Sequence, residues 1–147
     1  FALVSGASRG IGRAVTERFV AEGAHVFATD LDGAEDCAAD HAGENITYLQ
    51  ADVASEDDWQ RVANAISERA GKLHVLVNNA GIDGADALED LTLERWRKVM
   101  AVNVEGAFLA TRYCRDLLAR GGADCFGGAS IVNVSSVMGR VGFTDTS

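Results

Sequence analysis

The sequence predicts an α/β fold, a doubly wound parallel sheet, and two observations carry this prediction. Short apolar runs typical of strands recur along the chain, and segments with helical spacing of apolar residues lie between most of them. Strands that alternate with helices imply parallel pairing, right-handed crossovers and helices on both faces of the sheet. The length of 147 residues fits a single domain.

Five strands are expected, each a short apolar run of β-type residues. They are Ala2–Val4, His25–Thr29, Ile46–Ala51, Leu73–Val77 and Ser130–Ser135. Ligands of open parallel sheets bind beyond the carboxyl ends of the strands. The residues that follow each strand are therefore the candidate site.

The first helix is expected from Ile11 to Glu22, because apolar residues recur there at helical spacing and Gly23 follows as a stop signal. The residues at that spacing are Ile11, Val15 and Phe19. A shorter helix is expected over Leu31–Ala39.

Two further helices begin at side chains suited to cap them. Ser55, with Asp58 three residues later, predicts a capping box, and Gly71 ends that helix. Its expected buried face consists of Trp59, Val62, Ala63 and Ile66. Thr92 is expected to cap a long helix that carries Trp96, Val99, Met100, Asn103, Ala107 and Phe108.

A glycine-rich loop follows the first strand: Ser5-Gly6-Ala7-Ser8-Arg9-Gly10-Ile11-Gly12. Gly6 can adopt a tight turn, and Gly10 has no side chain to keep a phosphate from the backbone. Gly12 lets the helix lie close to the strand. Free N–H groups at the helix start, and the helix dipole, then favour an anion. The loop predicts a site for a dinucleotide pyrophosphate, although a flexible turn remains the alternative.

Asp30 follows the second strand, where a dinucleotide fold places an acid that accepts hydrogen bonds from the adenosine ribose. A 2′-phosphate about 4 Å from this carboxylate would be repelled by roughly 1–4 kcal/mol. NAD is therefore expected, and NADP is less favoured. Arg9 favours NADP instead, because a basic residue in the glycine loop could hold a 2′-phosphate. A surface acid in a turn is the alternative for Asp30.

Two more strand ends carry polar or small residues. Asp52 could accept a hydrogen bond from the adenine amino group, with Val53 against the ring, or it could be a helix-entry acid. Asn78-Asn79-Ala80-Gly81 could be a turn or a shelf under the cofactor, with Asn79 bracing neighbouring strands.

Asn103 and Ser136 are the candidates for catalytic chemistry. Asparagine has a poor helix propensity, and the helical face of Asn103 also carries apolar residues, so Asn103 is expected to be at least partly buried and partnered. A satisfied core asparagine is the alternative. Ser136, just past the last strand, could bond a substrate oxygen; Ser135 competes for that role, and either could be a turn serine.

Composition excludes several classes of partner and site. The net charge of −9 argues against binding to nucleic acid or to an anionic membrane, and no apolar run is long enough to cross a membrane. Cys37, Cys114 and Cys125 show neither metal-ligand spacing nor even pairing, which favours reduced thiols in a cytoplasmic protein. No metal site is expected, since the three histidines do not cluster either: His25, His41 and His74.

Taken together, these motifs resemble the classical short-chain dehydrogenases/reductases, whose fold is of the Rossmann type. The matching stretches are the glycine loop, Asp30, Asp52-Val53, Asn78–Gly81, Asn103-Val104 and Ile131–Ser136. The resemblance implies that Ser136 polarises the substrate oxygen and that Asn103 holds a water linking the site to solvent. It also implies the cofactor-binding residues: Gly6, Ser8, Arg9, Gly10, Ile11, Gly12, Asp30, Leu31, Asp52, Val53, Asn79, Ala80 and Gly81.

The family's proton donor lies in a Tyr-x-x-x-Lys motif that would fall beyond Ser147, and neither Tyr48 nor Tyr113 fits it. Residues 1–147 are therefore expected to be the front portion, about five strands, of a larger NAD(P)-binding domain truncated at both ends. A homodimer or homotetramer is expected for the complete protein, with apolar residues of the long helix such as Phe108 and Leu117 at its interface.

The expected function is hydride transfer between NAD(H) and a secondary alcohol or ketone, with a small-molecule substrate. One alternative is an NADPH-dependent reductase of 3-oxoacyl chains on a carrier protein. The other is a non-catalytic dinucleotide-binding module, if no Tyr-x-x-x-Lys follows Ser147.

Overall fold

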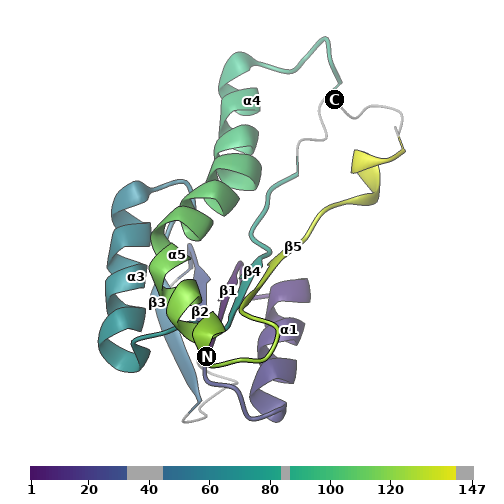
Figure 1. The fold of residues 1–147 in the computed structure, drawn as a ribbon. Helices are drawn as coiled ribbons and strands as arrows, with labels where there is room; N and C mark the ends of the chain where they lie inside the picture. The colour runs from purple at the N-terminus through teal and green to yellow at the C-terminus, as the bar shows by residue number, and fades with distance from the viewer. Residues whose placement is uncertain (33–44, 84–86, 142–147) are drawn as a thin grey trace.

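The computed structural model describes residues 1–32, 45–83 and 87–141 and contains a parallel five-stranded sheet (Figure 1). The strands are β1 (Ala2–Ser5), β2 (Val26–Asp30), β3 (Ile46–Gln50), β4 (Val75–Asn78) and β5 (Ser130–Asn133). They pair in the order β3-β2-β1-β4-β5, and every pairing is parallel. The predicted doubly wound α/β fold is confirmed, with strand ends displaced by one or two residues.

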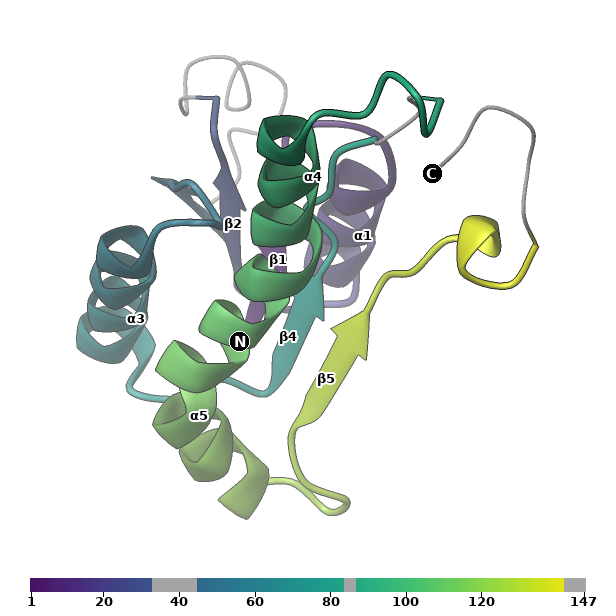
Figure 2. The same cartoon turned by 90° about the horizontal axis from the view of Figure 1, so that it is seen from above.

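The helices lie on both faces of the sheet (Figure 2). They are α1 (Gly10–Ala21), α3 (Glu56–Ala70), α4 (Leu93–Met100) and α5 (Gly106–Ala123), with a π-helical turn, η1 (Ala101–Glu105), joining α4 to α5, and a short 3₁₀ turn, η2 (Val137–Gly139). The helix predicted over Leu31–Ala39 falls mostly on residues 33–44, which lie outside the described part of the chain.

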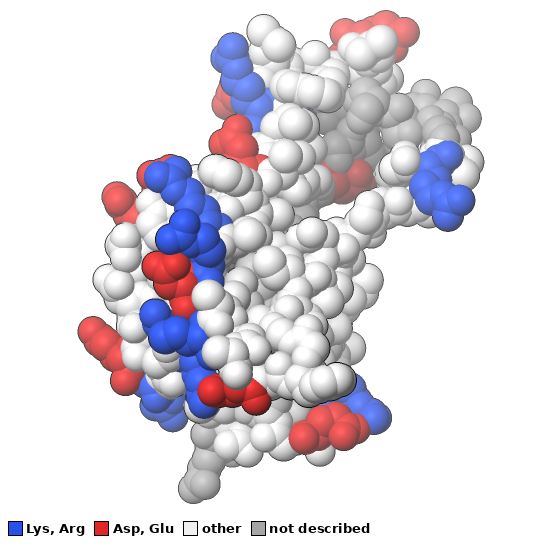
Figure 3. Space-filling model, in the orientation of Figure 1, with Lys and Arg blue, Asp and Glu red and all other residues white. Residues whose placement is uncertain are grey.

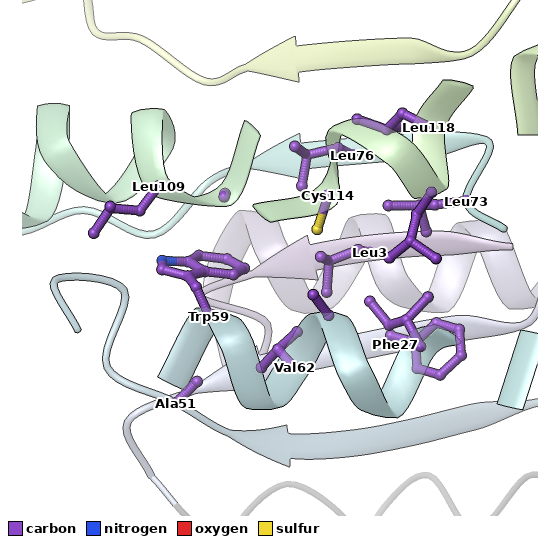
Figure 4. Close-up of a cluster of buried hydrophobic side chains, with 14 of the residues drawn as sticks. Leu3, Phe27, Ala51, Trp59, Val62, Leu73, Leu76, Leu109, Cys114 and Leu118 are labelled. Carbon is purple, nitrogen blue, oxygen red and sulfur yellow. The ribbon is translucent and has the colours of Figure 1, made fainter. Parts of the chain in front are cut away.

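The main core lies between the sheet and the pair α3 and α5 (Figure 4). The predicted face of α3 is confirmed, because Trp59, Val62, Ala63 and Ile66 are all buried. They pack with Leu3 and Phe27 of the sheet and with Cys114 of α5. A smaller cluster under α1 contains Val4, Val26 and Val77.

Glycines end both α1 and α3 as predicted. Gly71 adopts φ +69° at the end of α3, and its N–H donates to the carbonyls of Ile66 and Ser67. Gly23, with φ +85°, donates to the carbonyl of Val20 beyond the end of α1. In each case the left-handed backbone satisfies carbonyls that the helix leaves open.

The long helical segment begins as predicted, but only part of its expected subunit interface is exposed. Thr92 does cap α4, accepting from the N–H of Arg95 at 3.1 Å. Phe108 is exposed, which is compatible with the subunit interface expected there, and Trp96 is exposed as well. Leu117, expected at the same interface, is instead buried in the main core. The π-helical turn between α4 and α5 changes the helical phase, so one regular period cannot describe both helices.

β5 is an edge strand whose four residues are all exposed. It ends at Asn133, two residues before the predicted end. Figure 3 shows positive and negative side chains interleaved over the helices, whereas the surface over β5 is mostly uncharged. An apolar groove of about 450 Å³ runs beside β5, lined by α1 side chains with Val77, Val132 and Val134.

Candidate cofactor-binding site

A cleft of about 460 Å³ opens at the carboxyl ends of β1, β2, β3 and β4. Of the residues predicted to bind a cofactor, it is lined by Gly6, Arg9, Asp30, Leu31, Asp52, Val53, Asn79, Ala80 and Gly81. Ser8, Gly10, Ile11 and Gly12 are not part of that lining. Ile11, one of the apolar residues of the predicted first helix, is exposed and lines the groove beside β5 instead.

Gly6 and Gly12 allow the backbone to pack more closely than any side chain would. A Cβ on Gly12 would lie 2.0 Å from the Gly6 carbonyl oxygen, so α1 with any other residue at this position would have to move away from the loop. Gly6 adopts φ +65°, and its Cβ would lie 2.8 Å from the Cα of Ala80. These close approaches bring the loop, α1 and the end of β4 together around the cleft.

The start of α1 has neither a side-chain cap nor an acid in its first turn. Its N-cap residue is Arg9, and Gly10 has φ +55° with open space where a Cβ would stand. Uncapped N–H groups, a positive helix end and a nearby guanidinium suit a pyrophosphate. The residues present at this end of the cleft therefore fit a dinucleotide.

Ser5 and Asn79 tie β1 to the loop after β4. The Ser5 hydroxyl oxygen accepts from the N–H groups of Asn79 and Ala80, each at 3.1 Å, and donates to the Val77 carbonyl at 3.4 Å. The Asn79 amide donates to the carbonyls of Ser5 and Gly6 at 2.9 and 3.0 Å. The predicted bracing of neighbouring strands by Asn79 is confirmed.

Asp30 ties the glycine loop to the end of β2. Its Oδ2 accepts from the N–H and the hydroxyl of Ser8 at 2.9 and 2.6 Å, and its Oδ1 accepts from the N–H of Leu31 at 2.8 Å. Ser8 thus orients the carboxylate, although it does not line the cleft. Asp30 lines the cleft, and hydrogen bonds from Ser8 and Leu31 hold its two carboxylate oxygens in place.

Asp52 and Val53 line the cleft and also start the turn into α3. Asp52 Oδ1 accepts from the N–H of Ala54 at 2.8 Å, and its carbonyl accepts from the N–H of Ser55 at 3.0 Å. Asp52 is therefore a helix-entry acid and a cleft residue at once. Val53 is buried, and a Cβ on Gly106 would lie 3.1 Å from it.

Asn103 is exposed, so the expectation that it is at least partly buried was wrong. Its side-chain oxygen accepts from the N–H of Ile82 at 2.9 Å, and its side-chain nitrogen donates to the Ile82 carbonyl at 2.9 Å. The partners of this amide are thus backbone groups just beyond the Asn79–Gly81 shelf. The π-helical turn η1 places Asn103 there, outside the core.

Ser136 lies past β5, outside the lining of the cleft, and is exposed. Its hydroxyl oxygen accepts from the N–H of Met138 at 3.2 Å, which caps η2. Ser135 is also exposed, so the structure does not choose between the two serines.

Sequence reasoning missed the opposite wall of the cleft. Lys98, Ala101 and Val102 line it from α4 and η1, and Ala51, Ala54 and Ile82 complete the lining. The spacing of Lys98, Ala101 and Val102 places them on one helical face, but only the packing of α4 shows that this face meets the cleft.

Two of the three cysteines lie in the described residues, and both are free thiols. Burial raises the pKa of the Cys114 thiol to about 12. Cys125 is exposed, and Cys37 lies outside the described residues. Within the described residues, no helix is long and apolar enough to span a bilayer.

The chain matches the family model described as short chain dehydrogenase over residues 1–147. It is 38% identical over 144 residues to the NADP-dependent (R)-specific alcohol dehydrogenase of Lentilactobacillus kefiri, covering 96% of this chain and 56% of the relative. It is also 38% identical over 143 residues to the rhamnolipids biosynthesis 3-oxoacyl-[acyl-carrier-protein] reductase of Pseudomonas aeruginosa, covering 94% and 55%.

Among solved structures, the ligand-free aldohexose dehydrogenase of Thermoplasma acidophilum matches with a TM-score of 0.85 and 30% identity, covering 99% of this chain and 52% of that chain. The chain therefore spans about half the length of the relatives that it matches. The family model and these relatives agree with the resemblance drawn from the motifs. The chain belongs to the short-chain dehydrogenase/reductase family.

Proposed function

We propose that this chain is the cofactor-binding front portion of an NAD-dependent oxidoreductase that interconverts a secondary alcohol and a ketone. One observation carries the proposal: a single cleft joins the uncapped start of α1 to the carboxylate of Asp30 and to the Asn79–Gly81 shelf. The start of α1 suits a pyrophosphate, and the carboxylate of Asp30 suits the hydroxyls of a ribose. The Asn79–Gly81 shelf suits a flat ring system with its ribose.

Each part of the cleft has an assigned role in this proposal. Gly6, Arg9 and the first N–H groups of α1 hold the pyrophosphate, while Asp52 and Val53 bind the adenine. Asn79, Ala80 and Gly81 carry the nicotinamide ribose. The bound dinucleotide supplies the hydride chemistry, and the protein supplies position and polarisation.

Ser136 donates a hydrogen bond to the substrate oxygen in this proposal. Because the Asn103 amide is committed to Ile82, Asn103 would hold a water through its backbone carbonyl. The proton donor belongs to the Tyr-x-x-x-Lys motif that the family resemblance places beyond Ser147.

The preference for NAD rests on the carboxylate of Asp30. Both of its oxygens accept hydrogen bonds from the protein, which hold the carboxylate at the edge of the cleft, where its negative charge would repel a 2′-phosphate. The relative from Lentilactobacillus kefiri is NADP-dependent by its name, so the preference is a proposal for this chain alone.

A specific observation favours the NADPH-dependent reduction of carrier-bound 3-oxoacyl chains as a second candidate. Arg9 and Lys98 are both exposed and line the cleft, so two cations face a ligand there. The Pseudomonas aeruginosa relative bears the name of such a reductase.

The proposal extends to the whole protein as a cytoplasmic homodimer or homotetramer in which residues 1–147 form the front of one NAD(P)-binding domain. The free thiols of Cys114 and Cys125 support a reducing compartment. The exposed rings of Trp96 and Phe108 support a contact along α4 and α5.

The test is a titration of the full-length protein with NADH and with NADPH, followed by an assay of ketone reduction. NADH is expected to bind about tenfold tighter or more, as a repulsion above about 1.4 kcal/mol requires. Tighter binding of NADPH, with turnover of carrier-bound 3-oxoacyl chains, would favour the second candidate. Tight binding without turnover of either substrate class would indicate a non-catalytic module.

A further inference from the structure

One wall of the cleft is held from outside by side chains of α3. This wall segment, Gln50–Val53, runs from the end of β3 to the turn before α3, and its residues Ala51, Asp52 and Val53 line the cleft. Its position fixes where an adenine ring and its hydrogen-bond partner would stand. The groups that hold the wall segment are therefore of functional interest.

Only half of the capping box predicted at Ser55 forms, and the carboxylate of Asp58 contacts the wall segment instead. The first half of the box forms, since the Ser55 hydroxyl oxygen accepts from the N–H of Asp58 at 3.2 Å. The carboxylate of Asp58 does not return to the N–H of Ser55. Its Oδ2 accepts from the N–H of Asp52 at 2.8 Å, inside the wall segment.

Arg61, one turn later on α3, makes a second connection to the same segment. Its Nη2 donates to the Gln50 carbonyl at 2.6 Å and to Asp58 Oδ1 at 2.7 Å. The Gln50 side chain in turn donates to the Leu31 carbonyl at 2.8 Å, beside Asp30. Hydrogen bonds thus run from α3 through the end of β3 to the end of β2.

Polar contacts matter here because open space lies behind the wall. A second cleft of about 330 Å³ is lined by Leu31, Gln50, Ala51, Asp52, Asp58 and Arg61. Leu31, Ala51 and Asp52 line both clefts, so they separate them. Ala51 and Val53 pack with Trp59 of α3 in the main core, and Trp59 Nε1 donates to the Val53 carbonyl at 2.8 Å. Beside the second cleft, the charged hydrogen bonds of Asp58 and Arg61 instead hold Asp52 and Gln50. Such bonds are stronger and more directional than neutral ones.

We propose that Asp58 and Arg61 are positioning residues for the adenosine half of the cofactor, acting through the wall segment. They fix the backbone of Gln50 and Asp52 and so set the placement of the Asp52 carboxylate. This inference rests on the proposed function for the identity of the ligand. Neither residue lines the main cleft, so the effect is indirect.

The test measures the binding of ADP-ribose, which is the proposed ligand without its nicotinamide ring, to the full-length protein by calorimetry. Asp58→Ala removes both connections of the carboxylate and is expected to weaken binding about tenfold. Asp58→Asn keeps an oxygen that can accept from Asp52, so it is expected to recover part of the loss. Asp57→Ala removes an equal charge from the same helical turn at an exposed position and is expected to stay within about twofold of the unmodified protein.

Arg61→Gln guards against a folding defect, because Arg61 is exposed and its removal disturbs no packed core. It is expected to weaken ADP-ribose binding about threefold, and to raise the cofactor KM while leaving kcat unchanged. If Arg61 only stabilised the fold, Arg61→Gln would lower the melting temperature of the protein and leave the affinity of the folded protein for ADP-ribose unchanged.

The outcomes separate the inference from the function on which it rests. If the unmodified protein fails to bind ADP-ribose, the proposed function is wrong. If it binds, and Asp58→Ala and Arg61→Gln match Asp57→Ala, the positioning role is wrong. If Asp58→Ala does not fold, Arg61→Gln alone decides between these results.

Discussion

The starts of α1 and α3 both follow strands of the same sheet, yet their first turns are opposite in chemistry. α3 is capped by Ser55 and carries Glu56, Asp57 and Asp58 in its first turn. α1 has Arg9 at its N-cap, no side-chain cap and no acid in its first turn. The start of α3 satisfies its own N–H groups and dipole, whereas the start of α1 leaves them open to an anion, as the proposed function requires.

Under the proposed function, the α3 start serves the stability of the fold and the α1 start serves ligand binding. Caps and acids near a helix start each contribute roughly 0.3–2 kcal/mol to stability. α1 does without them, and its glycines allow a ligand to reach the backbone.

Gly12→Ala should have the largest effect, because its Cβ would stand 2.0 Å from the Gly6 carbonyl oxygen. We expect the free energy of unfolding to fall by about 3 kcal/mol, which is the cost of overpacking, and the affinity for NADH to fall more than about tenfold. Denaturant unfolding and NADH titration measure the two effects. Gly71→Ala at the end of α3 is the control: it should cost only about 1 kcal/mol and leave affinity intact. Equal effects of the two variants would contradict the account.

Arg9→Asp would give α1 the kind of start that α3 has. An N-cap acid should stabilise the ligand-free protein by about 0.5–1 kcal/mol. The same carboxylate should weaken NADH binding about tenfold, since it repels the pyrophosphate and replaces a cation. Melting curves with and without NADH measure both effects. An unchanged affinity would show that the anion does not bind at this helix start.

Ser55→Ala removes the cap of α3 and should destabilise the protein by about 1 kcal/mol. NADH affinity should stay within about twofold, because the Ser55 side chain does not contact the ligand and the Asp58 carboxylate keeps its bonds to Asp52 and Arg61. Chemical denaturation and calorimetry make the comparison. A loss of affinity as large as that of Arg9→Asp would remove the distinction between the two helix starts.

Acid should erase a small stabilising contribution from Asp58. The hydrogen bond from the Asp52 N–H, and then Arg61, hold the pKa of Asp58 below its ordinary value of 3.8. A carboxyl with a lowered pKa stabilises the folded state above its unfolded-state pKa and loses this effect as the pH falls through the folded-state value. The gap in melting temperature between the unmodified protein and Asp58→Asn should therefore be constant near neutral pH and close below the folded-state pKa. A gap that widens on acidification would be inconsistent with this.

Sequence reasoning succeeded where a feature depends on neighbours in the chain. The caps at Ser55 and Thr92 and the stop at Gly71 follow from local backbone chemistry, and they were predicted correctly. Of the two interpretations of the Asn78–Gly81 stretch, a turn or a shelf braced by Asn79, the structure shows the brace at Asn79.

The misses share one physical cause: they depend on how separate elements pack. Asn103 bonds the backbone of Ile82 in the loop after β4, and Leu117 packs into the main core. The partner of the Asp58 carboxylate lies on another element's loop, and Lys98 reaches the cleft only through the placement of α4. Periodicity within one segment carries no information on these contacts.

The most direct test of the central claim compares backbone amide signals at the two helix starts during a titration with NADH. The full-length protein, labelled with ¹⁵N, would be followed by two-dimensional NMR. The account predicts large shifts for Gly10, Ile11 and Gly12, with Glu56 and Asp57 unmoved. Shifts at Glu56 and Asp57 equal to those of the glycine loop, or saturation by NADH without any shift at Gly10–Gly12, would contradict it.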